Sequence, residues 1–275
     1  MTKNNNLGTV SLSNSVWLNI IRKLQTDRAY RDAEKLFYAE GIRNLVQLTC
    51  NDFDIAAVIC SEKLLTSAIA RKQVRTLRQK GVPIISLSPE QFRSLSHTPR
   101  ASGIGVVAQQ RWSRLHTVSP QKSLCWVILE QVRTPGNLGT LIRSSEAIGG
   151  SGFILLGNSI DPYTPSIVRA SMGALFHQCF IRTNIKTLRH WIRRHRAQVV
   201  GASPDGHVNM HQAKYRSPTL LLLGEERKGL TAVQRSLCQN LVQIPMVGQV
   251  DSLNLGVAGS LLLYEIYRAK RYRTR

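Results

Sequence analysis

Short apolar runs alternate with helix-like patterns along most of this 275-residue chain. In the second half, three of these runs each lead into a polar, glycine-containing segment: Asn137–Arg143, Leu223–Leu230 and Ile244–Asn254. Strands that alternate with helices favour an α/β fold with a mostly parallel sheet covered on both faces. Since such sheets bind ligands at the carboxyl ends of their strands, we expect the three segments to form one composite site.

The same patterns predict how the chain divides. We expect a disordered, polar N-terminus, a small α/β domain, a polar and basic linker and a larger α/β domain, over residues 1–13, 14–108, 109–123 and 124–275 respectively. Within the first domain, the spacing of apolar residues also predicts a short helix over Tyr30–Ala39.

The charge of the chain indicates a polyanionic partner. Lys and Arg number 37 against 16 Asp and Glu, a formal net charge of +21. The excess occurs on both sides of Leu115, so it is not confined to a tail. We interpret the partner as nucleic acid rather than a membrane surface, because no basic amphipathic helix stands apart from the globular pattern. The alternative is a basic protein kept soluble by its charge.

Several other classes find no support in the sequence. The five cysteines show neither C-x-x-C spacing nor nearby histidine pairs, so we expect no metal. The first residues lack the apolar stretch of a signal peptide, and Leu253–Ile266 is too short to cross a bilayer. We therefore expect a cytoplasmic protein without a membrane partner. The dinucleotide fingerprint, the P-loop and the nucleophile elbow are also missing.

The first polar segment offers an amide and a guanidinium at helical spacing. Asn137 is a candidate cap for the helix that follows it. Arg143 lies one and a half turns further on and either faces the ligand cleft or is a solvated residue paired with Glu146.

The second segment places Glu225 and Glu226 directly after a buried strand. We favour a role in the site, although pairing with Arg227 and Lys228 is the alternative. Gly224 permits close approach of the backbone to a ligand.

The third segment precedes the last helix. Ser252 or Asn254 is a candidate N-cap, and the backbone amides of such a helix start suit a phosphate or a polar cofactor edge.

Taken together, the three segments resemble the motifs of a known family. Asn137-x-Gly139-x-x-x-Arg143, Leu223-Gly-x-Glu226-x-x-Gly229-Leu230 and Ile244-Pro-Met246 with Ser252-Leu-Asn254 are similar, in order, to those of the SpoU/TrmH-type RNA 2′-O-ribose methyltransferases of the SPOUT class. The stretch from Arg31 to Gly41 resembles the start of the L30e-like substrate-binding domain that many members carry.

The resemblance implies a fold, a cofactor and an assembly. It implies a trefoil knot near the C-terminus, S-adenosylmethionine as methyl donor, and a homodimer formed through the C-terminal domain. The residues it places around the cofactor are Leu223, Gly224, Ile244, Met246 and Leu253.

The resemblance also implies roles for polar residues. Arg143 corresponds to the arginine at the ribose 2′-hydroxyl, Asn137 to the asparagine that helps hold it, and Glu226, Ser252 and Asn254 to residues that shape the site. A guanidinium is a poor base, so binding the adjacent phosphate and orienting the hydroxyl is the easier task for Arg143. Glu225 and the pair Leu255-Gly256 depart from the usual family wording.

The first domain supplies candidate RNA-binding side chains. We assign this role to Arg22, Lys23, Arg28, Arg31, Arg71, Lys72, Arg75 and Arg78. The last four recur at helical spacing, which predicts either a basic stripe or an ordinary solvated helix face. We expect ribosomal RNA rather than transfer RNA as substrate. The alternatives are a transfer-RNA 2′-O-methyltransferase and a non-catalytic RNA-binding factor of ribosome assembly that keeps the fold.

Overall fold

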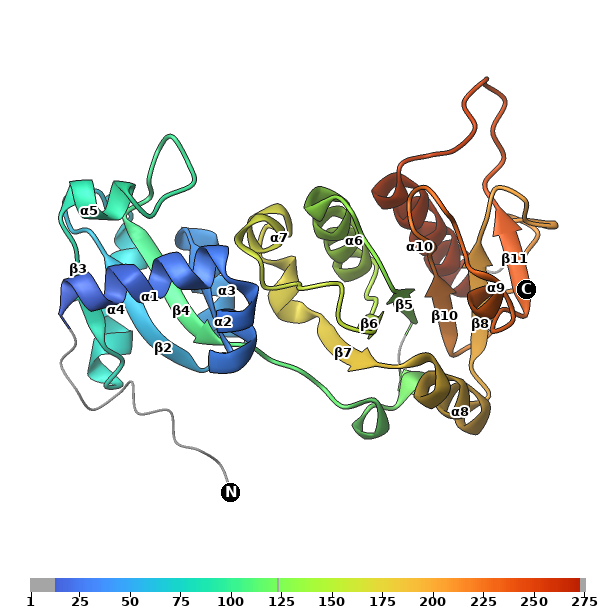
Figure 1. The fold of residues 1–275 in the computed structure, drawn as a ribbon, viewed down its shortest axis with the longest axis horizontal. Coiled ribbons are helices and arrows are strands. Elements are labelled where there is room, and N and C mark those ends of the chain that lie inside the picture. Colours follow the sequence, from blue (N-terminus) through green and yellow to red (C-terminus); the bar gives the residue numbers. More distant parts are fainter. Residues whose placement is uncertain (1–12, 123, 273–275) are drawn as a thin grey trace. The chain divides into compact units, whose positions relative to one another are not determined.

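The computed structural model describes residues 13–122 and 124–272 (Figure 1). The predicted disordered N-terminus lies, apart from Ser13, outside these residues. The chain forms two compact units. Unit 1 comprises Met1–Gln110 with Tyr163–Phe176, and unit 2 comprises Arg111–Pro162 with His177–Arg275.

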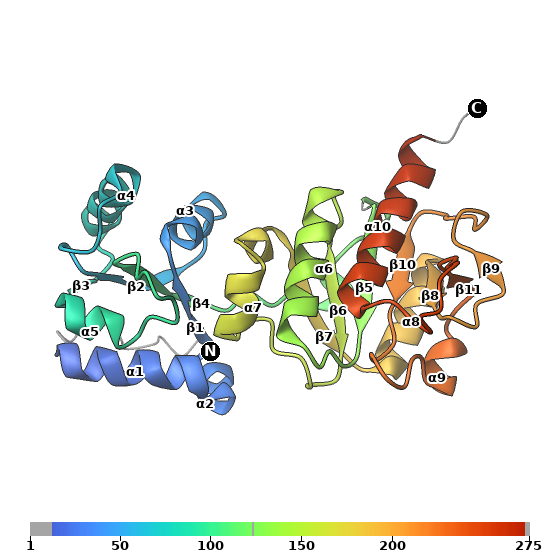
Figure 2. The same ribbon diagram turned by 90° about the horizontal axis from the view of Figure 1, so that it is seen from above.

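Unit 1 is a four-stranded sheet between two layers of helices. Its strands are β1 (Leu36–Glu40), β2 (Ile55–Cys60), β3 (Ile84–Ser86) and β4 (Ile104–Gln109), in the order β1-β4-β2-β3. Helices α1 (Asn14–Thr26), α2 (Arg28–Glu34) and α5 (Pro89–Arg93) cover one face, and α3 (Ile42–Cys50) and α4 (Ala68–Gln79) the other (Figure 2). Only β2 and β3 are parallel.

The predicted helix over Tyr30–Ala39 is wrong in its second half. Helix α2 ends at Glu34, and Lys35 adopts a left-handed conformation with φ of 58°. The next residues form β1, which pairs antiparallel with β4 from Leu36 opposite Gln109 onward. The first four residues of β1 are apolar and buried. A strand covered on both faces can bury all four, whereas a helix would expose part of them.

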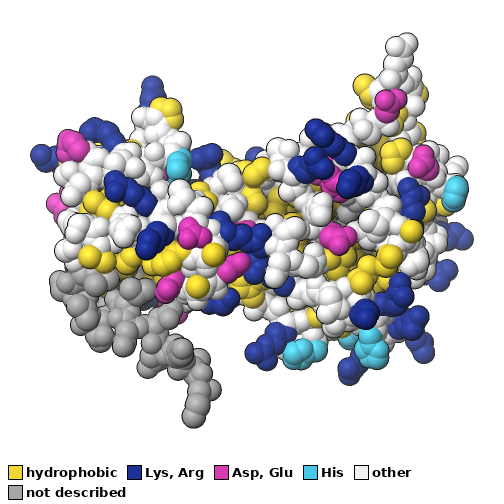
Figure 3. Space-filling view, in the orientation of Figure 1, with side chains coloured by type: hydrophobic (Ala, Val, Ile, Leu, Met, Phe, Trp, Pro, Cys, Tyr) yellow, Lys and Arg dark blue, Asp and Glu magenta, His cyan; other side chains and the backbone are white. Residues whose placement is uncertain are grey.

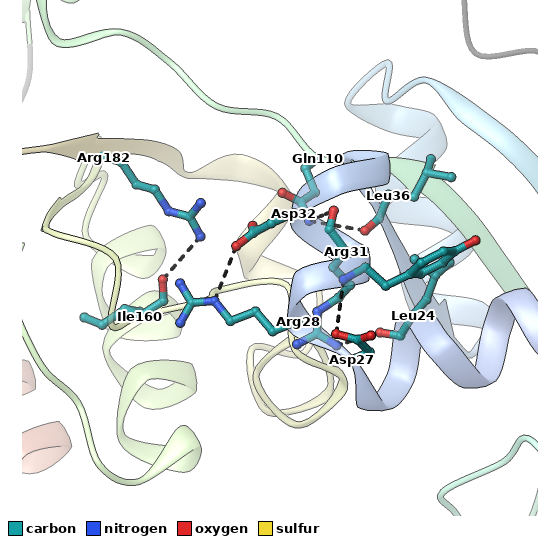
Figure 4. A network of polar contacts seen from close by, with 10 residues as sticks. Leu24, Asp27, Arg28, Arg31, Asp32, Leu36, Gln110, Ile160 and Arg182 are labelled. Atoms are coloured by element: carbon teal, nitrogen blue, oxygen red, sulfur yellow. Dashed lines mark hydrogen bonds and ion pairs between the residues drawn. The ribbon is translucent and has the colours of Figure 1, made fainter.

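Arg31 is a structural residue of unit 1, which corrects its assignment to RNA binding. Its side chain is only 3% exposed, and its guanidinium donates a hydrogen bond of 2.8 Å to the Leu24 carbonyl (Figure 4). Gln110 Nε2 donates to the carbonyls of Arg31 and Leu36 over 3.0 and 3.2 Å. A buried arginine that completes the end of a helix is not available to a phosphate.

Residues 163–176, which include α7 (Pro165–Ala170), group with unit 1, whereas our sequence-based boundaries included them in the second domain. Aromatic packing accounts for this. The ring of Phe37 lies 4.8 Å from that of Tyr163 and 6.1 Å from that of Phe176, centroid to centroid, and Phe53 lies 5.3 Å from Phe176.

Unit 2 is a seven-stranded sheet in which every pair of neighbouring strands is parallel. Its strands are β5 (Cys125–Leu129), β6 (Gly152–Leu156), β7 (Cys179–Thr183), β8 (Gln198–Ala202), β9 (Val208–Asn209), β10 (Thr219–Leu222) and β11 (Asn240–Gln243). Their order is β7-β6-β5-β10-β8-β11-β9. This confirms the predicted α/β class, while the trefoil knot stays a prediction.

Helices cover both faces of the second sheet. On one side lie α6 (Pro135–Ala147) and α10 (Leu255–Arg271), and on the other α8 (Ile185–His195) and α9 (Ala232–Arg235) (Figure 2). Helices α6 and α10 pack closely at Gly259, where a Cβ would lie 2.3 Å from Leu141 Cδ2. The predicted linker contains short turns at Leu115–Thr117 and Pro120–Lys122.

The topology of unit 2 brings the three polar segments to one edge. The first follows β5, the second follows β10, and the third follows β11 and leads into α10. Because all these strands run in one direction, their carboxyl ends, and hence the three segments, meet at the same edge of the sheet.

Candidate active site

A cavity of about 310 Å³ lies at the carboxyl ends of β8, β10 and β11. The residues that we assigned to the cofactor all line it: Leu223, Gly224, Ile244, Met246 and Leu253. Two residues from the catalytic set, Glu226 and Ser252, line it as well. The second and third polar segments therefore contribute to one cavity, and its lining combines apolar side chains with both acidic and basic ones.

Gly224 is required where β10 ends. A Cβ on this residue would lie 2.3 Å from the carbonyl carbon of Gly229, much closer than side chains tolerate. The approach arises because the segment folds back on itself, with backbone hydrogen bonds of 3.2 and 2.9 Å between Glu225 and Gly229. Gly229 has φ of 65°, which glycine adopts without strain. The two glycines thus shape the cavity wall.

Glu226 joins the second segment to the first. Its carboxylate accepts hydrogen bonds from the backbone amides of Arg133, at 3.1 Å, and Thr134, at 3.5 Å, and from Asn137 Nδ2, at 3.2 Å. Burial raises the pKa of Glu226, but hydrogen bonds from its own backbone amide and from these three donors outweigh burial and lower the pKa below its ordinary value. The carboxylate is therefore ionised at neutral pH and fixes the start of α6.

Glu225 pairs with the guanidinium of Arg133. In the described part of the chain, no ion pair joins either glutamate to Arg227 or Lys228, both of which are exposed. Sequence reasoning missed Arg133, because nothing in its spacing distinguishes it from other surface arginines. It also missed Asp205 and Arg235, which line the same cavity and pair at 3.6 Å.

Asn254 caps α10. Its Oδ1 accepts from the backbone amides of Gly256, at 2.9 Å, and Val257, at 3.3 Å. Of the two candidate caps, the structure thus selects Asn254 and leaves Ser252 exposed at the cavity.

Arg143 is exposed on α6. Within residues 13–122 and 124–272, no hydrogen bond or ion pair joins it to Glu146, the alternative partner, or to Asn137, whose amide is directed to Glu226. Its guanidinium is thus available to a ligand.

The basic residues assigned to RNA binding are spread over three helices of unit 1, α1, α2 and α4. Arg22 and Lys23 are exposed on α1, and Arg28 forms an ion pair of 3.4 Å with Asp32. All four residues of the predicted stripe, Arg71, Lys72, Arg75 and Arg78, are exposed on α4. Its three arginines line a shared cavity of about 420 Å³.

The described residues show neither a metal-binding cluster nor a membrane-spanning helix. They contain no cluster of three or more His, Cys, Asp or Glu side chains arranged to hold a metal ion. They also contain no helix whose length and hydropathy would let it cross a bilayer.

A parallel α/β sheet with a polar-rimmed cavity at the carboxyl ends of its strands defines the class of cofactor-binding α/β enzymes. Comparison with known proteins identifies the family within this class. The family model described as "SpoU rRNA Methylase family" matches residues 125–264, and that of the "MRM3-like substrate binding domain" matches residues 19–105.

Individual relatives agree with the family models. The chain is 29% identical to the 23S rRNA (uridine(2479)-2′-O)-methyltransferase of Streptomyces viridochromogenes over 85% of this chain and 83% of that protein. The AdoMet-bound rRNA methyltransferase of Sinorhizobium meliloti superposes with a TM-score of 0.85 at 29% identity, covering 95% of this chain and 97% of that one. The AdoMet complex of the SpoU methyltransferase AviRb from S. viridochromogenes also superposes with a TM-score of 0.85, at 27% identity, covering 94% of this chain and 99% of that one.

The chain belongs to the SpoU rRNA methylase family, which confirms the predicted resemblance. It is an S-adenosylmethionine-dependent RNA 2′-O-methyltransferase.

Proposed function

We propose that this enzyme methylates a ribose 2′-hydroxyl of ribosomal RNA and binds S-adenosylmethionine in the cavity beside β10 and β11. The observation that carries the proposal is that all five residues assigned to the cofactor line this one cavity. Leu223, Ile244 and Leu253 suit the apolar faces of an adenine, and the acidic and basic side chains of the lining suit a ligand that carries charges of both signs. The bound cofactor supplies a methyl group that is already activated by its sulfonium.

Arg143 is the residue that we propose to meet the RNA. An exposed guanidinium without an internal partner is suited to a phosphate, and a phosphate held there orients the neighbouring ribose. We assign it no role as a base, because a guanidinium keeps its proton well above neutral pH. The remaining task of the protein is alignment of the reacting groups, which removes about 7–11 kcal/mol of barrier in favourable cases.

Ribosomal RNA is favoured by the relatives that cover most of the chain. The Streptomyces relative acts, by its name, on 23S rRNA, and both structural neighbours above are rRNA or SpoU methyltransferases. Other relatives are named only as tRNA/rRNA methyltransferases, so transfer RNA is the second candidate substrate. A cytoplasmic location stays a prediction.

We propose further that two chains associate through α10. Val257, Leu261 and Tyr264 follow one another at helical spacing and are all exposed, which leaves an apolar stripe on a helix that packs against α6. A second copy of the chain would bury this stripe.

The test combines cofactor binding with mapping of the product. Calorimetry with S-adenosylmethionine should show binding to the purified protein, and 2′-O-methyl sites in total RNA should be compared in cells with and without it. A new site in ribosomal RNA is expected, whereas a site in transfer RNA would select the other substrate.

Arg143→Ala should abolish methyl transfer and leave S-adenosylmethionine affinity unchanged, because Arg143 does not line the cofactor cavity. The control is Arg194→Ala, an exposed arginine of α8 that does not line the cofactor cavity. Near-normal turnover of the Arg143 variant would refute its assignment.

A further inference from the structure

Helix α8 carries a concentration of positive charge that the proposed active site does not use. Figure 3 shows Lys, Arg and His side chains gathered over this helix, at the lower right of the view. Its buried face consists of Leu188, Trp191 and Ile192. The remaining positions include four cations and two histidines without a single acid: Lys186, Arg189, His190, Arg193, Arg194 and His195.

A cavity of about 670 Å³ lies where this helix ends. Cationic side chains from two separate elements line it: Arg193 and Arg196 at the end of α8, and Lys214 and Arg216 ahead of β10. No Asp or Glu is among its lining residues. In the described part of the chain, no ion pair is formed by any of the four cations, all of which are exposed. The cavity therefore presents uncompensated positive charge.

The walls of this cavity are held in place. The Gln198 side chain spans the segment ahead of β10, donating 2.7 Å to the Lys214 carbonyl and accepting 2.6 Å from the Arg216 amide. Arg196 caps α8 in a left-handed conformation with φ of 50°. Glycine favours that position, and a residue with a Cβ adopts it only at a cost in free energy. An arginine held at this cost keeps a guanidinium at the cavity mouth.

The cavity lies at the opposite end of the sheet from the candidate active site. Gln198 and Asn240 begin β8 and β11, whereas the cofactor cavity lies where the same strands end. A five-residue strand such as β8 spans about 16 Å. A ligand that used both regions would have to be an extended polyanion.

We propose that the cavity at the end of α8 binds the phosphodiester backbone of the RNA substrate, away from the nucleotide that is methylated. This rests on the proposed function, which supplies RNA as the polyanion. The site contributes affinity rather than sequence choice, since guanidinium and ammonium contacts to phosphates position a nucleic acid without reading its bases.

The test is the salt dependence of binding to a short poly(U) strand. Each phosphate contact on a single strand contributes about 0.7 to the slope of log K against log salt. The double variant Arg193→Gln, Arg196→Gly should lower this slope by about 1.4 and weaken binding several-fold. Glycine at 196 relieves the left-handed conformation, so the fold is expected to tolerate the change. The pair Lys214→Gln, Arg216→Gln, on a different element, should act in the same way.

The matched control is Lys186→Gln, Arg194→Gln, which removes two exposed cations of the same helix that do not line the cavity. Its slope should stay close to that of the parent. An equal loss in the control would overturn the proposal in favour of general charge. Unchanged RNA binding with a lower melting temperature in the cavity variants would also overturn it, because the cations would then serve only the helix dipole.

Two further measurements separate the remaining outcomes. Inorganic pyrophosphate should compete with poly(U) only weakly. Tight pyrophosphate binding to the cavity, with unchanged poly(U) binding in the variants, would identify a small-anion site and overturn the proposal. Calorimetry with S-adenosylmethionine should give the parent affinity in every variant. A parent protein without cofactor binding or methyl transfer would instead refute the proposed function.

Discussion

At the scale of single residues, the glutamate after β10 connects two of the three polar segments. Glu226→Gln keeps the shape of the side chain but replaces a carboxylate that accepts from Arg133, Thr134 and Asn137. Because the group is partly exposed, solvent screening limits the expected loss of unfolding free energy to about 1 kcal/mol at neutral pH. Urea unfolding measures it, and Glu146→Gln on the exposed side of α6 is the control.

The same variant has a pH signature. The pKa of Glu226 is lowered in the folded protein, so its stabilisation is complete above the unfolded value of about 4.3. It is lost as pH falls through the lower folded value. The difference between parent and variant should therefore be present at neutral pH and vanish in acid. A difference that grew on acidification would show that the carboxylate is protonated in the fold.

A substitution at Gly224 tests whether the wall that this residue forms belongs to the cofactor site. In Gly224→Ala the new methyl group meets the backbone of Gly229, so the segment must shift. Overpacking of this kind costs about 1–3 kcal/mol, and 1.4 kcal/mol corresponds to tenfold in affinity. We expect S-adenosylmethionine to bind about 5- to 100-fold more weakly by calorimetry. Gly248→Ala, in the third segment, places its methyl group in open space and should bind normally. Equal affinities of Gly224→Ala and the parent for S-adenosylmethionine would show that the cofactor does not bind beside Gly224.

At the scale of elements, the sequence predicted what local patterns encode. The cap at Asn254 and the strand-to-segment order of unit 2 follow from composition over a few residues. The strand β1 does not, because Leu36–Glu40 suits a helix as well as a strand until β4 pairs with it from far along the chain. The contact between Glu225 and Arg133 is also non-local, so no spacing rule identifies Arg133.

The boundary between α2 and β1 gives a test of this explanation. The left-handed conformation of Lys35 costs free energy, whereas glycine adopts the same conformation without strain. Lys35→Gly should raise the unfolding free energy by up to about 1 kcal/mol, after allowance for the greater freedom of glycine in the unfolded chain. Lys80→Gly, at the end of α4 with φ of −80°, should lower it. Thermal melts compare the two. Destabilisation by both would mean that the side chain of Lys35, and not its backbone, fixes the turn.

At the scale of the whole molecule, the proposed RNA contacts account for the positive charge but not for the exposed apolar stripe of α10. Aromatic packing among Phe37, Tyr163 and Phe176 joins segments of one unit that are far apart in the sequence, and no local pattern predicts these contacts. The exposed stripe of α10 shows the reverse. Its helical spacing can be seen in the sequence, but no residue of the described chain covers it. Burial of this stripe by a second chain would explain why it is apolar.

Leu261→Glu tests whether two chains associate through α10. Leu261 is 41% exposed in the middle of the stripe, so a carboxylate there is tolerated by a monomer but would be buried without a partner in a dimer. Light scattering over a range of concentrations should show a dimer for the parent and a monomer for the variant. Ile69→Glu, at a 65% exposed position of α4, makes the same substitution elsewhere and should remain dimeric. If the second chain completes the active site, methyl transfer by Leu261→Glu should fall with the dimer fraction and recover as protein concentration rises. A variant that stays dimeric and fully active would show that α10 is not the interface.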